Sequence, residues 1–218
     1  MKALQRIQIN RENAILVVVD MENEFCKPGG KLYTETSARI MPGVISAIHR
    51  LDEQARGAGI PIIYIQGVRT LREPEFTVFG MEPHIKLGTW GAEIVEELRP
   101  QQEDIVVQKF CHDPFYQPAL DRVLQKLVSD PTQCCAVVTG GAINVCAYHT
   151  VMGFYLRNYW TIVPVDSVYY LSEPDNQRAL EQFSHLAYPN IFLSRSDLIE
   201  VSQVPTVARP APMPAEPG

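Results

Sequence analysis

The stretch CCAVVTGGAINVCAYHT, residues 134–150, runs from a short apolar segment through a Gly-Gly turn into a second apolar segment, 146–157. The first segment has the length and the β-branched content of a buried strand. The second is apolar nearly all round, which is typical of a buried helix. A strand that leads through a tight turn into a buried helix is the repeating element of α/β folds.

Similar apolar runs recur along the chain and alternate with helical patterns. The runs are too apolar for strands with one solvated face, which predicts a mainly parallel sheet of about six strands with helices on both faces. The expected fold is therefore a three-layer α/β/α architecture with right-handed crossovers. Pro164 is expected near the end of its strand, because proline cannot donate to a ladder. The expected strands are 14–20, 60–66, 104–109, 134–140, 160–166 and 190–194, and the expected helices are 42–56, 117–128, 146–157 and 174–187.

The length of 218 residues suits one domain with a large core. Residues 1–203 are predicted to form this domain. Residues 204–218 are rich in proline and poor in large apolar side chains, which predicts a flexible tail.

The charge and the cysteines restrict the function classes. A formal net charge of -6 argues against nucleic acid or an anionic membrane as a partner. No apolar run approaches the roughly 20 residues that span a bilayer, and the first residues lack the apolar middle of a signal peptide. The five cysteines show no disulfide-framework spacing, so reduced thiols in a cytoplasmic protein are expected.

Three reactive side chains follow or end predicted strands. Asp20 ends the first strand, Lys109 ends the third, and Cys146 follows the Gly-Gly turn after the fourth. Singly, each has an ordinary alternative role as a turn residue, a solvated charge or a packed thiol. Because ligands of such folds bind outside the carboxyl ends of the strands, the three together predict a site at that edge.

The chemistry of these three residues fits nucleophilic catalysis. A helix N-terminus and the Lys109 ammonium are both expected to lower the pKa of the Cys146 thiol. Asp20 is placed to take the thiol proton and return it to a leaving group. The backbone N–H groups of the turn are expected to bind a developing oxyanion.

Three segments, VVVDMENEF (17–25), QKFCHDPFYQPAL (108–120) and GGAINVCAYHT (140–150), resemble the signature segments of the isochorismatase-like cysteine hydrolases. The resemblance covers roughly residues 13 to 195. Together with GTWGAEIVEELRP (88–100), the chain looks most similar to the branch of ureidoacrylate, biuret and N-carbamoylsarcosine amidohydrolases.

This resemblance implies roles for individual residues. Asp20, Lys109 and Cys146 match the family's catalytic triad, and a cis peptide bond is implied at Gly141–Ala142. The N–H groups of Ala142 and Cys146 would then form the oxyanion hole. The resemblance also implies no cofactor and a homo-oligomer, either a dimer or a tetramer.

Substrate-binding candidates are less specific. Glu22 stands where the family commonly has Gln, and we expect its carboxylate to recognise an N–H-rich group; a solvated or ion-paired glutamate is the alternative. Departures from the family pattern also occur at Ile143 and Pro118. The further pocket-lining candidates are Gln66 and three aromatic residues for which core packing is the alternative reading: Phe25, Trp90 and Phe115.

No metal ion is predicted. The region after the second strand contains His84 but lacks the Asp–His pairing of the metal-binding nicotinamidases, and the remaining histidines have no ligand spacing. His149, three residues after Cys146, is an alternative dyad partner on one helix face. Adjacent side chains on a helix surface seldom converge on a third atom, so this alternative is disfavoured.

The prediction is a hydrolase acting on non-peptide C–N bonds, a cysteine-dependent amidohydrolase. It would cleave a small amide or ureido substrate through a thioester intermediate and release ammonia or an amine. Two alternatives stay open: an isochorismate-type vinyl-ether hydrolase that works through the aspartate, and a non-catalytic member of the fold that binds a metabolite. The presence of Cys146 argues against the first, and the intact triad argues against the second.

Overall fold

A six-stranded parallel sheet forms the centre of the computed structural model, which describes residues 2–202. The predicted tail, 204–218, lies outside the described residues, and the assignment of 1–203 to one domain stays a prediction. The strand order is β4-β3-β2-β5-β6-β7, and every neighbouring pair is parallel. The strands are β2 (Ala14–Val19), β3 (Ile62–Gly67), β4 (Ile105–Lys109), β5 (Cys135–Gly140), β6 (Trp160–Pro164) and β7 (Ile191–Ser194). The predicted fold class is confirmed, and Pro164 ends β6.

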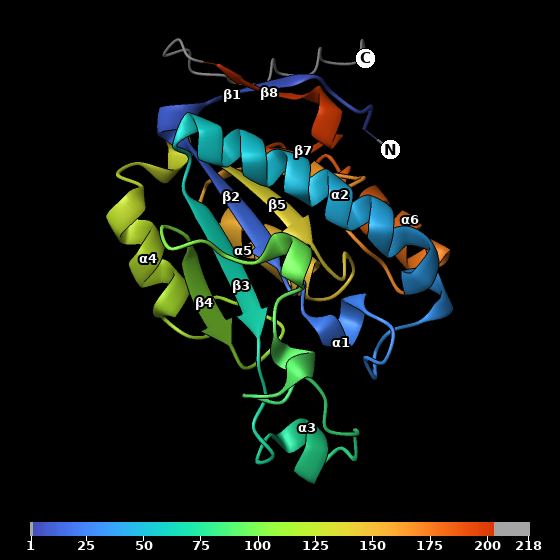
Figure 1. The fold of residues 1–218 in the computed structure, drawn as a ribbon. Helices are drawn as coiled ribbons and strands as arrows, with labels where there is room; N and C mark the ends of the chain where they lie inside the picture. Colours follow the sequence, from blue (N-terminus) through green and yellow to red (C-terminus); the bar gives the residue numbers. More distant parts are fainter. Residues whose placement is uncertain (1, 203–218) are drawn as a thin grey trace.

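Helices cover both faces of this sheet (Figure 1). Helix α2 (Glu35–Ala58) crosses one face, and α4 (Ala119–Leu127), α5 (Cys146–Leu156) and α6 (Glu173–Phe183) cover the other. All six residues of β2 are buried, with Leu16 and Val18 in the cluster under α2 and Val17 in the cluster under α5. A central strand covered on both faces needs apolar residues at every position, which explains why its sequence does not alternate.

Helix α2 begins seven residues earlier than expected. The prediction placed its start near Pro42, because proline is favoured in the first turn of a helix. The structure instead places the N-cap at Thr34, whose hydroxyl accepts a hydrogen bond from the Ser37 N–H at 3.1 Å, and Pro42 lies inside the helix. The helix ends at Gly59 in the left-handed conformation that glycine favours.

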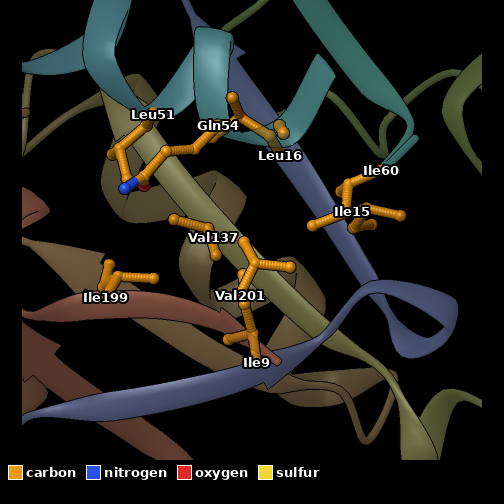
Figure 2. Close-up of a pocket in the computed structure, with 10 residues that line it drawn as sticks. Ile9, Ile15, Leu16, Leu51, Gln54, Ile60, Val137, Ile199 and Val201 are labelled. Carbon is orange, nitrogen blue, oxygen red and sulfur yellow. The ribbon is translucent and has the colours of Figure 1, made fainter. Parts of the chain in front are cut away.

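A second, two-stranded parallel sheet was not predicted. Strand β1 (Ile7–Asn10) pairs with β8 (Ile199–Ser202). Figure 2 shows a small apolar pocket between this sheet, α2 and the first residues of the central strands. Its lining includes Ile9, Ile199 and the strand-start residues Ile15 and Val137. The pocket therefore lies at the amino ends of the strands, opposite the edge where the predicted site was expected.

The segment between β3 and β4 contains α3 (Pro74–Thr77), which stands away from the body of the molecule at the carboxyl ends of the strands (Figure 1). A short helix α1 (Asn23–Cys26) follows β2 at the same edge. The 3-10 turns are η1 (Arg11–Asn13), η2 (Trp90–Ala92), η3 (Glu96–Leu98), η4 (Pro131–Gln133) and η5 (Ser196–Leu198). Within residues 2–202, none of the helices has both the length and the apolar content needed to cross a bilayer.

Candidate active site

Three strand ends bring Asp20, Lys109 and Cys146 together. Asp20 follows β2, Lys109 ends β4, and Cys146 begins α5 directly after the turn that follows β5. Asp20 has a φ of +47°, a left-handed conformation that is rare for residues other than glycine. Its N–H donates to Ile65 O at 2.9 Å, and its carbonyl accepts from the Tyr169 hydroxyl at 3.2 Å, so neighbouring strands and loops hold this conformation.

The Lys109 ammonium joins the other two side chains. Its Nζ lies 2.8 Å from Asp20 Oδ2, 3.3 Å from Cys146 Sγ and 3.1 Å from the carbonyl oxygen of Cys111. An ammonium has three N–H donors, so these three contacts use all of them. Both Lys109 and Asp20 are almost fully buried. The arrangement fixes the carboxylate and the sulfur on either side of one cation.

Burial and the neighbouring charges shift the pKa values of Lys109 and Cys146, and some of these causes oppose others. Burial lowers the pKa of Lys109, but the Asp20 carboxylate and the Cys146 sulfur raise it by more, so the net shift is upward and the ammonium stays charged. Burial and the Asp20 carboxylate raise the pKa of the Cys146 thiol well above its usual value, against the opposing effect of Lys109. The expectation of a lowered thiol pKa is therefore wrong for the free protein, chiefly because burial disfavours the thiolate and next because the Asp20 carboxylate opposes the effect of Lys109.

A fourth side chain contacts the sulfur. His112 Nδ1 lies 3.3 Å from Cys146 Sγ, and the His112 side chain is exposed. His149, the alternative partner considered from the sequence, is also exposed, and its ring makes an edge contact with Tyr148. Sequence reasoning missed His112, although it lies only three residues after Lys109 in one of the signature segments. The direction of the His112 side chain depends on the path of the loop after β4, which the sequence does not give.

The Gly-Gly turn between β5 and α5 needs both glycines. Gly140 has a φ of +85°, and a Cβ atom there would lie 2.0 Å from Val19 O. A Cβ atom on Gly141 would lie 2.6 Å from the ring of Tyr169. The loop after β6 also binds this turn, since Tyr169 N–H donates to Gly140 O at 3.0 Å and Ile143 N–H donates to Tyr169 O at 2.8 Å.

The backbone of the turn faces the start of α5. The peptide bond Gly141–Ala142 is cis, at the position that the resemblance implied. The carbonyl of Ala142 accepts from the N–H groups of Val145 and Ala147. Among the described residues, no acceptor is recorded for the N–H of Ala142 or of Cys146. These two donors are therefore available to a ligand.

Glu22 is fully buried beside the triad. Its Oε1 accepts the N–H of Gly67 at 2.7 Å, whereas its Oε2 has no hydrogen-bond partner among the described residues. Asp20 Oδ1 is unpartnered in the same way. Burial, followed by the Asp20 carboxylate, raises the pKa of Glu22 well above its usual value, while Lys109 and the Gly67 N–H act in the opposite direction. The site thus contains two buried carboxyl oxygens that have no hydrogen-bond partner among the described residues.

The other predicted pocket residues lie apart from one another. Phe115 packs edge-on against Phe154 in the core under α5, at a ring distance of 5.2 Å. Phe25 is half-buried, with its ring 6.2 Å from that of Tyr169. Gln66 and Trp90 line a separate open groove of about 1020 Å³, whose lining residues include none of the triad.

The metal-ligand residues considered from the sequence are not clustered. His84 lies near Glu75, which pairs with the buried Arg69. No group of three or more His, Cys, Asp or Glu side chains with metal-binding geometry is found within residues 2–202. All five cysteines are free thiols.

The three-layer α/β fold and the buried Asp20, Lys109 and Cys146 at the carboxyl ends of its strands are together those of a cysteine hydrolase. Residues 14–191 match the isochorismatase domain family, which spans most of the chain. The chain belongs to the isochorismatase family of hydrolases.

Three similar proteins illustrate this relationship. YaaI, an isochorismatase family protein of Bacillus subtilis strain 168, is 27% identical over 183 residues, which cover 84% of this chain and 95% of YaaI. The ureidoacrylate amidohydrolase RutB of Pseudomonas savastanoi pv. phaseolicola is 31% identical over 179 residues, covering 71% of this chain and 69% of RutB. The crystal structure of N-carbamoylsarcosine amidase from Thermoplasma acidophilum superposes with a TM-score of 0.70 at 29% identity, covering 85% of this chain and 97% of the amidase.

Proposed function

We propose that this protein is a cysteine-dependent amidohydrolase that cleaves the C–N bond of a small amide or ureido substrate. The observation that carries the proposal is the position of Lys109 Nζ, 2.8 Å from Asp20 Oδ2 and 3.3 Å from Cys146 Sγ. This arrangement supplies a nucleophile, a proton acceptor and a cation in one buried place.

The first half-reaction transfers the acyl group to sulfur. Because burial keeps the thiol protonated in the free protein, its proton must leave as Sγ attacks the substrate carbonyl. Asp20 accepts this proton, and Lys109 then stabilises the developing thiolate. As the tetrahedral intermediate collapses, the C–N bond breaks and the proton passes from Asp20 to the departing nitrogen. Ammonia or an amine leaves, and the acyl group stays on Cys146 as a thioester.

The oxyanion of the tetrahedral intermediate needs fixed donors. The N–H groups of Ala142, in the turn, and of Cys146, four residues later at the start of α5, have no acceptor among the described residues. Removal of one such donor typically slows an acyl-transfer enzyme about 100-fold or more. Water completes the cycle by hydrolysing the thioester.

The substrate class rests on the relatives and on Glu22. RutB is named for ureidoacrylate and the structural neighbour for N-carbamoylsarcosine, and both of these compounds carry a ureido group. The unpartnered Oε2 of Glu22 can accept an N–H of such a group. Substrate binding of this kind would favour the ionised form of Glu22, which burial disfavours in the free protein. Glu22→Gln should therefore change the substrate profile, and an identical profile would contradict this role.

Ammonia release from a substrate panel tests the proposal. The panel contains nicotinamide, biuret, a ureidoacrylate analogue, N-carbamoyl amino acids and simple aliphatic amides. Turnover by the wild type should disappear in Cys146→Ala. Cys134→Ala is the matched control, because Cys134 is a buried thiol beside the start of β5, at the opposite edge of the sheet. Turnover that persists in Cys146→Ala would exclude the thioester route.

A further inference from the structure

The sulfur of Cys146 has polar neighbours of two different kinds. Lys109 and Asp20 are buried, with 2% or less of each residue exposed, and they form an ion pair with each other. His112 approaches the same sulfur at 3.3 Å but has an exposed side chain. The exposed neighbour is the one that solvent can reach.

We infer that His112 is a further catalytic residue, the general base that activates water for hydrolysis of the Cys146 thioester. This inference rests on the proposed function and divides its two half-reactions between two bases. Asp20 serves the attack of the thiol, and His112 serves the attack of water.

The two half-reactions place different demands on a base. In the first, the proton moves from sulfur to the departing nitrogen, and a buried carboxylate in the same group can carry it. In the second, a water molecule must arrive from solvent and lose a proton next to the acyl carbon, which is bonded to Sγ. A general base must lie within hydrogen-bond reach of that water. His112 Nδ1 lies 3.3 Å from Sγ, the atom that carries the acyl carbon, and His112 is exposed to solvent. Asp20, in contrast, is buried, and its Oδ2 accepts a hydrogen bond from Lys109.

The charges around His112 favour the neutral imidazole that a base requires. Partial burial is the largest cause that lowers its pKa, and the cations of Lys109 and Arg69 lower it further. The carboxylates of Glu75 and Asp20 act in the opposite direction without reversing the shift. The ring also contacts the Cys146 sulfur, with Nδ1 3.3 Å from Sγ. With the pKa lowered from a usual value of about 6.5, the imidazole is neutral at neutral pH.

The step balances without any further reactant. The water oxygen bonds to the thioester carbon as His112 Nδ1 takes one water proton. The tetrahedral intermediate then breaks its C–S bond, and Sγ leaves with the electron pair. The imidazolium returns the proton to sulfur. Water and thioester have become a carboxylic or carbamic acid and the free thiol, and His112 is neutral again.

The test uses p-nitrophenyl acetate, which acetylates a reactive thiol rapidly and releases coloured p-nitrophenol. The p-nitrophenol burst measures acetylation. Intact-mass and peptide-mass spectrometry after removal of the reagent follow loss of the acetyl group from Cys146. The proteins are the wild type, His112→Asn, His112→Gln and the control His149→Asn. His149 is an exposed histidine on α5, the helix that begins with Cys146.

Both His112 variants should acetylate within a few-fold of the wild-type rate and lose the acetyl group about 100-fold more slowly or worse, the usual contribution of a general base. Hydroxylamine attacks thioesters with little need for a base, so it should remove the acetyl group from all four proteins at similar rates. His149→Asn should match the wild type. In the wild type, deacetylation should slow as pH falls through the lowered His112 pKa, and this dependence should vanish in both His112 variants.

Two results would overturn the inference. Deacetylation by water at the wild-type rate in His112→Asn and His112→Gln would show that Asp20 or solvent serves both half-reactions. Slower deacetylation matched by an equal slowing with hydroxylamine would assign His112 a merely structural role. A wild type that never carries acetyl on Cys146 would instead contradict the proposed function, which separates the two failures.

Discussion

Lys109 and Asp20 form a buried ion pair, with Nζ 2.8 Å from Oδ2 and each side chain only 2% exposed. Burial of two charges is costly unless each charge is paired and its hydrogen bonds are satisfied. Lys109 meets this condition through Asp20, Cys111 O and Cys146 Sγ. The Cys146 sulfur is thus one of the three groups that keep the buried cation satisfied, and under the proposed function this links the stability of the site to its reactivity.

Lys109→Met should destabilise the protein by about 3–5 kcal/mol, because it leaves the Asp20 carboxylate buried without its partner. Asp20→Asn combined with Lys109→Met should recover part of this loss, since neither charge is then present. Chemical denaturation followed by circular dichroism measures both differences. A Lys109→Met variant within 1 kcal/mol of the wild type would show that the Asp20–Lys109 ion pair is not needed for the stability of the fold.

Asp20→Asn should change turnover and thiol reactivity in opposite directions. Turnover falls because the proton acceptor is lost. Burial is the largest cause that raises the pKa of Cys146 and the Asp20 carboxylate is the next, so loss of this charge lowers that pKa while the effect of burial remains. A decrease of one pKa unit gives about tenfold more thiolate while the thiol is mostly protonated. Iodoacetamide labelling of Cys146 at pH 8 should therefore accelerate, with the exposed Asp197→Asn as control. Labelling slower than in the wild type would contradict these electrostatics.

Gly141→Ala and Gly43→Ala should have opposite effects on stability. A Cβ atom on Gly141 would overlap the Tyr169 ring at 2.6 Å, and overpacking of this kind costs about 1–3 kcal/mol. Gly43 lies inside α2 with no heavy atom within 4 Å of its added Cβ, so alanine should gain about 0.5–1 kcal/mol there.

The Tyr169 ring is the stated cause of the Gly141→Ala loss, and a double-mutant cycle with Tyr169→Ala tests it. The two changes should cost less together than the sum of their separate costs, because the second removes the atoms with which the first collides. Strict additivity in the free energy of unfolding would place the conflict elsewhere in the turn.

Glu22→Gln should gain stability relative to the wild type as pH rises. The folded-state pKa of Glu22 lies well above its usual value, chiefly because of burial and then because of Asp20. Between the unfolded-state pKa, about 4.3, and the raised folded-state pKa, the folded wild type holds a proton that the unfolded chain has released. Wild-type stability therefore falls with pH in this window by up to about 1.4 kcal/mol per pH unit.

Glutamine does not titrate, so this contribution is missing from the variant. Unfolding of both proteins in guanidinium chloride between pH 4.5 and 7.5 measures the difference. A difference independent of pH would show that Glu22 ionises as readily in the folded protein as in the unfolded chain.

Most of the sheet could be predicted because burial on both faces forces a continuous apolar run, and such runs are visible in the sequence. The six expected strands agree with the observed ones to within two residues at each end. The predicted start of α2 was wrong because Pro42 is the stronger boundary signal in the sequence. The hydrogen bond from the Ser37 N–H to the Thr34 hydroxyl, which marks the true start, is visible only in the structure. Strands β1 and β8 have four residues each, and the residues that pair, such as Ile7 and Ile199, are far apart in the sequence. Nothing local marks such a pairing.

The triad residues could be placed at one edge because parallel strands deliver their carboxyl ends together. The direction of a loop side chain has no such rule, which is why the contact of His112 with the sulfur was missed. Gln66 and Trp90 were placed at the site from sequence, whereas the structure places them in a different groove. The thiol pKa was predicted with the wrong sign for a related reason. The sequence indicates a cation near Cys146, whereas the burial of the sulfur, which is the largest cause of the raised pKa, and its closeness to Asp20 depend on the three-dimensional structure.

The pairing of β1 with β8 also bears on how the molecule is made. Ile7 sits opposite Ile199, so the two strands cannot meet until the ribosome has released nearly the whole chain. All six strands of the main sheet are synthesised by Ser194, before β8 emerges. Contacts between residues so distant in sequence are slow to form, because a long loop must close first. The two-stranded sheet is therefore expected to form late, at the amino ends of the main strands and opposite the edge that holds Asp20, Lys109 and Cys146.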